Sequence, residues 1–559
     1  MKLTKFLHDS NKVIIISCLI LLIVGSCKND NFLSVAPKGK LTNQVTFSSS
    51  TNADLFVNDI YNQLPNEKND YNQTDSYTDN DWTKATHTGA NTVRNGSISA
   101  ANVPTGPGGM WNWEQNYKAI RKCNVFLQQV KLYSANFTAA YIAQRSAEVT
   151  FLRAYFYSQL FTNYGGVPII TDPLDATNGD NIFIARSTIA QTLAFIEADC
   201  DAAAAVLPAS LDKTGRPTKG AALALKGWVE LFAASPLVNT TNDLAPWAKA
   251  AATNLQVMNM GVYSLYPNYT AQFLSPANFN NETIFARGYA PPSNGSKAEG
   301  QLGPVVVKGV VQCWGNYQPT QSLIDDYSMA NGLPITDPAS GYDPSNPYLN
   351  REPRFYSSVV YDGSPWQGDI ITTRIGGNNP INNGTGGDIS TTGYYGKKLL
   401  DESIQGQTSL GTSPSSANWI IFRYGEVLLN YAEAQNEAVG PDPSVYAALK
   451  LIRTRAGLPN FPDGLSQSAM RTDIRRERRI ELSFEEMRWY DIRRWVIATG
   501  PTGVLNTPQF GMKIVYTGGV PSYTPTKIFT NIFKDYNNWM PIPQTDLGKN
   551  PKLVQNPGY

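Results

Sequence analysis

The sequence predicts a mostly α-helical protein in which helical hairpins pack against an irregular, loop-rich lobe with short strands. Three observations predict this fold class. Amphipathic segments of helix length follow one another over residues 51–266. Gly, Pro, Asn and Ser then dominate residues 267–418, and helical patterns return over residues 419–499. The helical scaffold is therefore discontinuous in sequence, with a loop-rich insertion between its two parts.

The first 26 residues have the pattern of a lipoprotein signal peptide. Lys2, Lys5 and Lys12 precede an apolar run of twelve residues, Val13–Val24. A helix that spans a bilayer needs roughly 20 apolar residues, so this run is too short to span. Two small residues stand directly before Cys27. We expect cleavage before Cys27, acylation of Cys27, and attachment to a bacterial membrane through lipid.

The next residues, 27–50, are polar with little periodicity, and we interpret them as a lipidated tether that leads to the folded domain, residues 51–559. Expected helices then occupy much of residues 51–266. Their apolar spacing and their end signals, such as Gly165 after Tyr164 and Pro236 after Ala234, set their limits. The expected segments are Ala53–Leu64, Met110–Tyr133, Thr138–Tyr164, Ser187–Leu207, Lys219–Ala234 and Trp247–Met260.

Short strands and long loops are expected in the insertion, and long loops on a rigid scaffold often carry a binding site. The expected strands are Thr283–Arg287, Val305–Val311, Tyr356–Val360 and Asp369–Arg374. The second part of the scaffold is expected as three helices, Arg423–Glu437, Pro443–Ala456 and Gln467–Trp495. Residues 500–559 form a final Gly/Pro-rich segment.

Composition excludes several classes of function. Lys and Arg number 46 against 45 Asp and Glu, so the chain lacks the basic field that nucleic acid requires. The chain has only two histidines, too few for a His-rich zinc site and few candidates for the histidine of a Ser-His-Asp triad. Outside the signal and Cys27, three cysteines are too widely spaced for a metal pattern and allow at most one disulfide, and we expect buried free thiols. No cofactor or metal is predicted, and the Asp-rich runs, which match no EF-hand, are expected to be solvated loops.

Six ordered segments resemble the SusD/RagB family of Bacteroidetes outer-membrane lipoproteins. Two carry the most specific patterns: IRRERRIELSFEEMRWYDIRRW at Ile474–Trp495 and WMPIPQTDLGKNPKLVQNPGY at Trp539–Tyr559. The other four are Phe151–Ile170, Pro217–Pro236, Arg423–Glu437 and Leu449–Pro459. The resemblance spans most of the chain after the signal.

This resemblance implies a SusD-like fold with four tetratricopeptide-like helical hairpins. It also implies a function without catalysis: binding a nutrient, usually a glycan, and delivering it to a SusC-like, TonB-dependent outer-membrane transporter. Lys28-Asn29-Asp30 resembles the short charged signal that directs such lipoproteins to the cell exterior. The Arg/Glu-rich helix at 475–494 is interpreted as structural, and Arg478 with Glu481 and Arg488 with Asp491 have ion-pair spacing.

The candidate ligand-binding residues lie in two aromatic-bearing loops. Similar proteins gather an arc of aromatic side chains from about these portions of the chain. Trp82, Trp314 and Tyr317 are predicted stacking platforms for sugar rings, whose apolar faces suit exposed aromatic side chains. Hydrogen bonds to sugar hydroxyls are predicted from three polar side chains, Asp81, Asn91 and Arg94.

Three other functions stay open at this stage. Capture of peptides or glycopeptides in a RagB-like uptake complex would also tolerate aromatic, loop-rich walls. A surface glycosidase would require two carboxyl groups that flank one bond, and no motif indicates such a pair. A helical-repeat scaffold for other proteins would explain the hairpins and leave the aromatic loops unexplained.

The lipidation site is directly testable. We expect Cys27→Ala to abolish incorporation of labelled fatty acid and to leave the chain unprocessed or mislocalised, because Cys27 is the residue that carries the lipid. Metabolic labelling followed by immunoprecipitation measures this, with Cys18→Ala, inside the apolar run, as the control. Labelling of the Cys27 variant at the wild-type level would refute the assignment.

Overall fold

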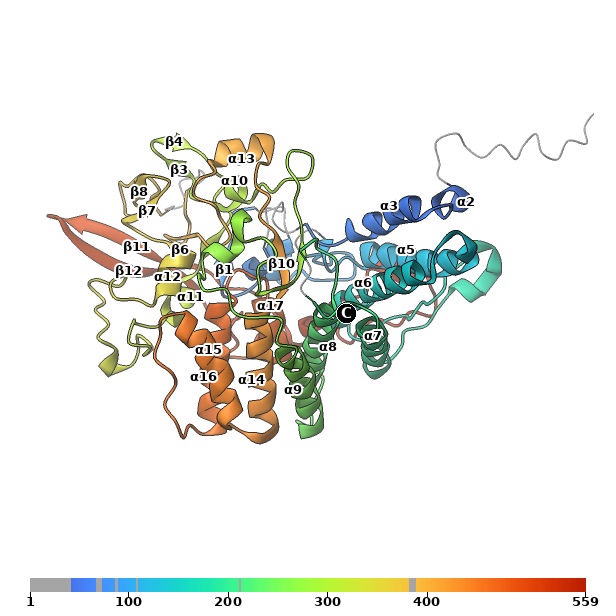
Figure 1. Ribbon diagram of the computed structural model, residues 1–559. Helices are drawn as coiled ribbons and strands as arrows, with labels where there is room; N and C mark the ends of the chain where they lie inside the picture. The colour runs from blue at the N-terminus through green and yellow to red at the C-terminus, as the bar shows by residue number, and fades with distance from the viewer. Residues whose placement is uncertain (1–41, 67–72, 86–88, 107–108, 211–212, 382–388) are drawn as a thin grey trace, which may run out of the picture.

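The computed structural model describes residues 42–559 except 67–72, 86–88, 107–108, 211–212 and 382–388 (Figure 1). The expected signal peptide, Cys27 and most of the expected tether lie outside these residues. The described end of that tether is folded, which corrects the predicted boundary at residue 50. Asn43–Thr46 forms helix α2, and the ring of Phe47 is buried against Phe56 and Phe126.

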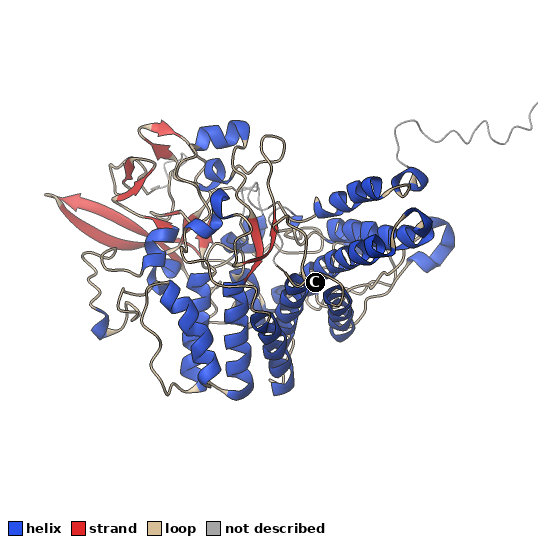
Figure 2. Cartoon of the chain, viewed as in Figure 1, coloured by secondary structure: helices blue, strands red, loops and turns tan. Residues whose placement is uncertain are grey.

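Four consecutive helix pairs build the scaffold, as the fold class predicts (Figure 2). They are α3 (Ser50–Tyr61) with α5 (Trp113–Leu132), α6 (Ala139–Tyr164) with α7 (Ile189–Ala204), α8 (Lys219–Ala234) with α9 (Leu244–Asn259), and α14 (Tyr424–Val439) with α15 (Pro443–Arg455). Helix α9 also packs on α14, so the two parts of the scaffold share one apolar core. Across the described residues, no helix is long and apolar enough to cross a membrane.

The expected helix 467–495 is broken into α16 (Gln467–Glu481) and α17 (Arg488–Arg494). Phe484 and Glu486 between them have left-handed backbone angles, φ 65° and φ 69°. The Phe484 ring packs on Tyr317 with ring centroids 4.2 Å apart, and its backbone N–H donates to the Asp75 carboxylate at 2.8 Å. These long-range contacts override the local helix propensity.

The irregular lobe has a second apolar core, built largely from residues 298–400. Its helices and those flanking it are short: α4 (Gly89–Arg94), α10 (Ala298–Leu302), α11 (Gln321–Asp326), α12 (Pro353–Ser358), α13 (Gly406–Thr412) and α18 (Gln544–Lys549). All strands pair antiparallel in twos: β1 (Asp81–Trp82) with β5 (Gln318–Pro319), β2 (Thr283–Arg287) with β10 (Trp419–Arg423), β3 (Val306–Val307) with β4 (Val310–Val311), β6 (Val359–Val360) with β9 (Tyr395–Gly396), β7 (Ser364–Trp366) with β8 (Asp369–Ile371), and β11 (Gln509–Thr517) with β12 (Val520–Phe529).

Three details of the lobe differ from the prediction. The expected strand 305–311 is a tight hairpin, and much of the expected strand 356–360 is the helix α12. The Gly/Pro-rich segment contains the long hairpin β11–β12, which projects from the lobe in Figure 1. Met512 and Ile514 of β11 are buried in the core of the lobe, so the hairpin is anchored at its base. Cys123, Cys200 and Cys313 are buried free thiols, as expected.

Ten buried charged groups join the scaffold to the lobe. Glu481 on α16 is paired with Arg354 of α12, Arg423 of β10 and Arg455 of α15. Burial opposes ionisation of Glu481, but the three guanidinium groups hold its pKa well below the usual range. The complete set, which we call the Glu481 network, consists of five cations, Arg354, Lys398, Arg423, Arg453 and Arg455, and five carboxylates, Glu282, Glu352, Glu477, Glu481 and Glu485.

The structural interpretation of the Arg/Glu-rich helix is confirmed, but its expected pairs within the helix are wrong. Arg478 binds Asp491 at 2.8 Å, and Arg488 binds Asp79 at 2.8 Å. Most of these charged side chains connect different elements, and Arg494 with Asp491 also forms an ion pair within one turn, at 2.9 Å.

Removal of one partner from the Glu481 network should be costly. We expect Arg423→Met to lower the free energy of unfolding by about 3–5 kcal/mol, because it leaves buried carboxylates without their cation. Urea unfolding at pH 7 measures this as a lower midpoint. The control is Arg121→Met, which removes an exposed guanidinium that donates to the Leu174 carbonyl at 2.7 Å and should change stability by about 0.5 kcal/mol or less. Equal midpoints for the two variants would contradict the structural importance of the network.

Candidate ligand-binding site

The two aromatic-bearing loops predicted to form the site lie side by side. Strand β1 pairs with β5, which places Asp81 opposite Pro319 and Trp82 opposite Gln318. The backbone N–H of Thr320 donates to the Asn80 carbonyl at 2.9 Å and extends the contact. The structure therefore brings together segments that are far apart in the sequence.

Trp82, Asn91 and Arg94 form one cluster, which we call the Trp82 cluster. The Arg94 guanidinium carbon lies 3.7 Å from the centroid of the Trp82 ring, and Arg94 Nη1 donates to Asn91 Oδ1 at 3.2 Å. The ring of Phe529 also contacts Trp82, at 4.8 Å between centroids. Burial lowers the pKa of Arg94 to about 9.

Several N–H donors in the Trp82 cluster are unused. Arg94 is only 6% exposed, and its Nε and Nη2 atoms have no hydrogen-bond partner among the described residues. The indole Nε1 of Trp82 is likewise buried and unpartnered there. Buried polar groups normally find partners, so the cluster offers donors that a ligand oxygen could satisfy.

Asp81 and Tyr317 do not face solvent, which corrects their predicted roles in direct contact. Successive residues of a strand point to opposite faces, so Asp81 turns inward where Trp82 turns outward. Burial and the nearby Asp75 carboxylate raise the pKa of Asp81 well above its usual range. The Tyr317 ring is fully buried against Phe484 and offers no face to a sugar ring.

Trp314 is the predicted stacking platform whose side chain is exposed to solvent. Its side chain is 45% exposed, and it lies four residues before Gln318, the strand partner of Trp82. A large exposed indole is uncommon on a surface that no ligand or partner covers, and one ring of this size can stack on a pyranose. The exposure of Trp314 fits its predicted role, which stays a prediction.

The Asp-rich stretch before β1 is buried, not solvated as expected. Although burial raises the pKa of Asp79, Arg479 and Arg488 lower it to about 2. Asp75 and Glu486 lie close together, and burial raises the pKa of both carboxyl groups although Arg488 acts to lower that of Asp75. Within the described ranges, no group of three or more His, Cys, Asp or Glu side chains is arranged to hold a metal ion.

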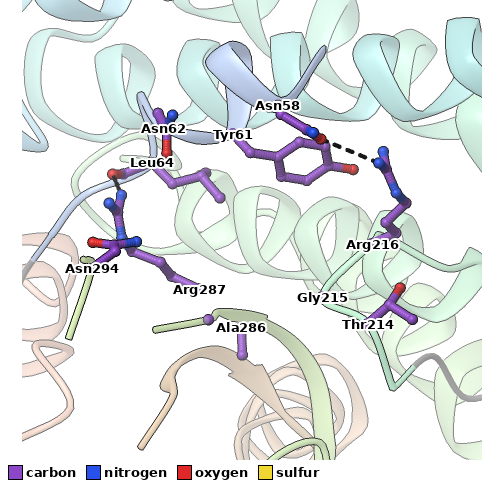
Figure 3. Close-up of a pocket in the computed structure, with 11 residues that line it drawn as sticks. Asn58, Tyr61, Asn62, Leu64, Thr214, Gly215, Arg216, Ala286, Arg287 and Asn294 are labelled. Atoms are coloured by element: carbon purple, nitrogen blue, oxygen red, sulfur yellow. Dashed lines mark hydrogen bonds between the residues drawn. The ribbon is translucent and has the colours of Figure 1, made fainter. Parts of the chain in front are cut away.

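A polar cleft that the sequence did not predict lies between α3 and β2 (Figure 3). Its volume is about 270 Å³. The described residues that line it are Asn58, Tyr61, Asn62, Leu64, Thr214, Gly215, Arg216, Ala286, Arg287, Gly288 and Asn294. They come from four segments of the chain, and none of those segments carries a recognisable motif. We call it the arginine cleft.

A scaffold of helical hairpins that carries exposed aromatic and amide side chains on an irregular lobe defines a class of ligand-binding protein. Comparison with known proteins agrees with this class. Residues 281–559 match the family described as the SusD family, and residues 31–231 match one described as starch-binding associating with outer membrane. The chain belongs to the SusD/RagB family.

Similar proteins of known structure align with nearly the whole chain. A SusD-like protein of known structure from Bacteroides fragilis is 29% identical, with a TM-score of 0.78 over 94% of this chain and 100% of that one. A SusD-like carbohydrate binding protein from the same species is 24% identical, with a TM-score of 0.76 over 91% of this chain and 100% of that one. SusD-like protein P25 of Formosa agariphila is 24% identical over 80% of this chain and 79% of its own length.

The buried carboxyl pair beneath β1 should make stability depend on pH. The pKa of Asp75 is raised in the folded protein, whereas an unfolded Asp has a pKa of about 3.9. Ionisation of Asp75 therefore costs stability as the pH rises through its folded pKa, and the cost is absent below about pH 3.9. We expect Asp75→Asn to melt above the wild type at pH 7.5 and to converge with it near pH 4.

The amide oxygen that this substitution introduces can still accept from the Phe484 N–H, so the hydrogen bond is preserved. Thermal melts at several pH values measure the difference, with the exposed Asp172→Asn as a control that should show no such trend. A variant that melts below the wild type at every pH would show that the Asp75 charge does not destabilise the folded protein.

Proposed function

We propose that this protein is a cell-surface lipoprotein that binds an oligo- or polysaccharide without cleaving it. The observation that carries the proposal is the exposed indole of Trp314 on the loop that leads into the β1–β5 pair. Family membership supports the proposal, and so does the carbohydrate-binding description of a similar structure. A glycan ligand suits a stacking platform together with unused N–H donors, because a sugar presents apolar ring faces and many hydroxyl oxygens.

In this proposal, Trp314 stacks on one sugar unit and the Trp82 cluster binds another part of the chain. Arg94 and Trp82 donate to ligand oxygens through N–H groups that have no hydrogen-bond partner among the described residues, and Asn91 orients Arg94 at 3.2 Å. Asp81 and Tyr317 support these residues from beneath and do not touch the ligand. A stacked aromatic ring contributes about 1 kcal/mol beyond the area it buries.

The absence of turnover is part of the proposal. A glycosidase needs two carboxyl groups on either side of the scissile bond, about 5–5.5 Å apart or about 6.5–9.5 Å apart. The carboxyl groups nearest the Trp82 cluster in sequence, Asp75, Asp79 and Asp81, are buried and face the protein interior. The described residues that line the arginine cleft include no Asp or Glu.

We further propose that Cys27 anchors the protein by lipid on the outer face of the outer membrane, beside a SusC-like, TonB-dependent transporter that takes over the ligand. Family membership and the description of a matched family as associated with the outer membrane support this arrangement. Binding alone does not move a ligand across a membrane, so import needs a pore and an energy source in a partner.

The first test measures glycan binding. We expect Trp314→Ala to weaken binding about fivefold or more and Trp82→Ala with Trp314→Ala to weaken it further, because the double variant loses both indole rings. A glycan array identifies the ligand, and calorimetry with that ligand measures the change. The control is Tyr516→Ala, an exposed ring on the projecting hairpin that should leave affinity unchanged.

Different results overturn different parts of the proposal. Normal binding by the double variant would reject these residues as the site. Capture of peptides from a peptide library, with no glycan bound, would favour the RagB-like alternative. Shortening of the bound oligosaccharide, lost on mutation of one Asp or Glu, would show an enzyme. Failure of the detergent-solubilised wild type to retain a barrel partner in an affinity pull-down would reject the import role.

A further inference from the structure

The arginine cleft has a positive charge that no described carboxylate neutralises. We propose that it binds the acidic group, a carboxylate or a sulfate ester, of a charged sugar. The inference rests on the proposed glycan-binding function and specifies the class of sugar. Two arginines, Arg216 and Arg287, reach the cleft from different segments, and the described lining contains no acidic side chain (Figure 3).

The charges behind the cleft account for one of these arginines. Arg216 pairs with Glu148 at 2.8 Å, and its Nη2 donates to Asn58 Oδ1 at 3.2 Å. Glu148 is buried and also pairs with Arg145, which in turn binds Asp54 at 2.7 Å. Three guanidinium groups, counting Arg287, thus face two carboxylates, which leaves one positive charge among these described residues.

Arg287 carries that excess charge. It forms no ion pair with any described residue, and its Nε atom is buried without a hydrogen-bond partner among them. This atom belongs to the Nε–Nη2 edge of the guanidinium. That edge has the two parallel N–H donors that match the two oxygens of a carboxylate or sulfate. A guanidinium that is partly withdrawn from water, with no counter-ion among the described residues, favours a ligand that supplies one.

The position of Arg287 is fixed before any ligand arrives. It is the last residue of β2, opposite Trp419 of β10, and its Nη1 donates to the Leu64 carbonyl in the loop just after α3. Its guanidinium carbon lies 5.9 Å from the centroid of the Tyr289 ring, whose hydroxyl donates to Asn66 at 2.9 Å. A side chain held this way loses little conformational freedom on binding.

The remaining walls suit a sugar better than a small inorganic anion. Asn58, Asn62 and Asn294 provide amides for hydroxyl groups, and Tyr61 provides part of an aromatic ring. A volume of about 270 Å³ is near the lower end for ligand pockets, about 300 Å³, and leaves room for one or two sugar units around the charged group.

Matched pairs of probes test the charge directly. The first pair is trigalacturonate and its fully methyl-esterified form, which keeps the same sugar chain and replaces each carboxylate with a neutral methyl ester. The second pair is a sulfated galactan oligosaccharide and its desulfated form, which separates sulfate from carboxylate recognition. We expect the wild type to bind the charged member of at least one pair about tenfold more tightly than the neutral member, in calorimetry at low salt.

Variants assign this preference to the cleft. Arg287→Gln keeps one donor for the Leu64 carbonyl and should reduce the preference to about twofold or less, and Arg287→Lys should retain part of it. Arg121→Gln is the matched control, because Arg121 also donates to a backbone carbonyl, outside the cleft, and should keep the full preference. Asn62→Trp, at an exposed position of the lining, should weaken binding of the charged probe without changing the charge of the cleft.

The outcomes are separable from those of the proposed function. A wild type that binds both members of each pair equally would overturn the inference and leave glycan binding intact. An unchanged preference in Arg287→Gln, with a wild-type melting temperature, would place the acidic subsite elsewhere and reject this cleft. Binding to none of the four probes would also overturn the inference, whereas the glycan array decides the proposed function separately.

Discussion

The position of the irregular lobe on the helical scaffold depends on the buried charges around Glu481. Its carboxylate is shared by arginines from α12 in the lobe, β10 at the junction and α15 in the scaffold. A buried charge is tolerated only when its partners are in place, so the network accepts few relative positions of these elements. Five cations against five carboxylates leave no net charge to destabilise the interior. Orientation, more than net stability, is what such a network provides.

The arginine cleft is connected to this network, and the Trp82 cluster is connected to other charged residues of α16 and α17. Strand β10 begins at Trp419, opposite Arg287, and ends at Arg423, opposite Thr283. The β2–β10 pair therefore runs from the arginine cleft at one end to the Glu481 network at the other. Near the Trp82 cluster, Arg479 and Arg488 bind Asp79, which precedes β1 by two residues. The break between α16 and α17 allows the charged side chains of one stretch of sequence to reach both regions.

The sequence is sufficient to predict what local patterns decide. The helix Lys219–Ala234 and the strand Thr283–Arg287 have the predicted limits, because apolar periodicity and end residues such as Thr218 and Pro236 act within a few residues. The break at Phe484 and the inward side of Asp81 were not predictable, since both depend on partners hundreds of residues away. The predicted partners of Arg478 and Arg488 were wrong for the same reason. The arginine cleft requires four separate segments to converge, and no single one reveals it.

The two regions offer physically different kinds of recognition. An aromatic ring holds a sugar by stacking, which depends little on salt and accepts many sugars. A guanidinium selects charge, but its reach in physiological salt is limited to about 8 Å. The chain as a whole has a net charge of only +1, so it exerts little long-range attraction on an acidic polymer. The proposed selection at Arg287 would therefore act in contact, after the ligand has arrived. Stacking at Trp314 would then determine whether a glycan is held, and charge at the arginine cleft would determine which glycan is retained.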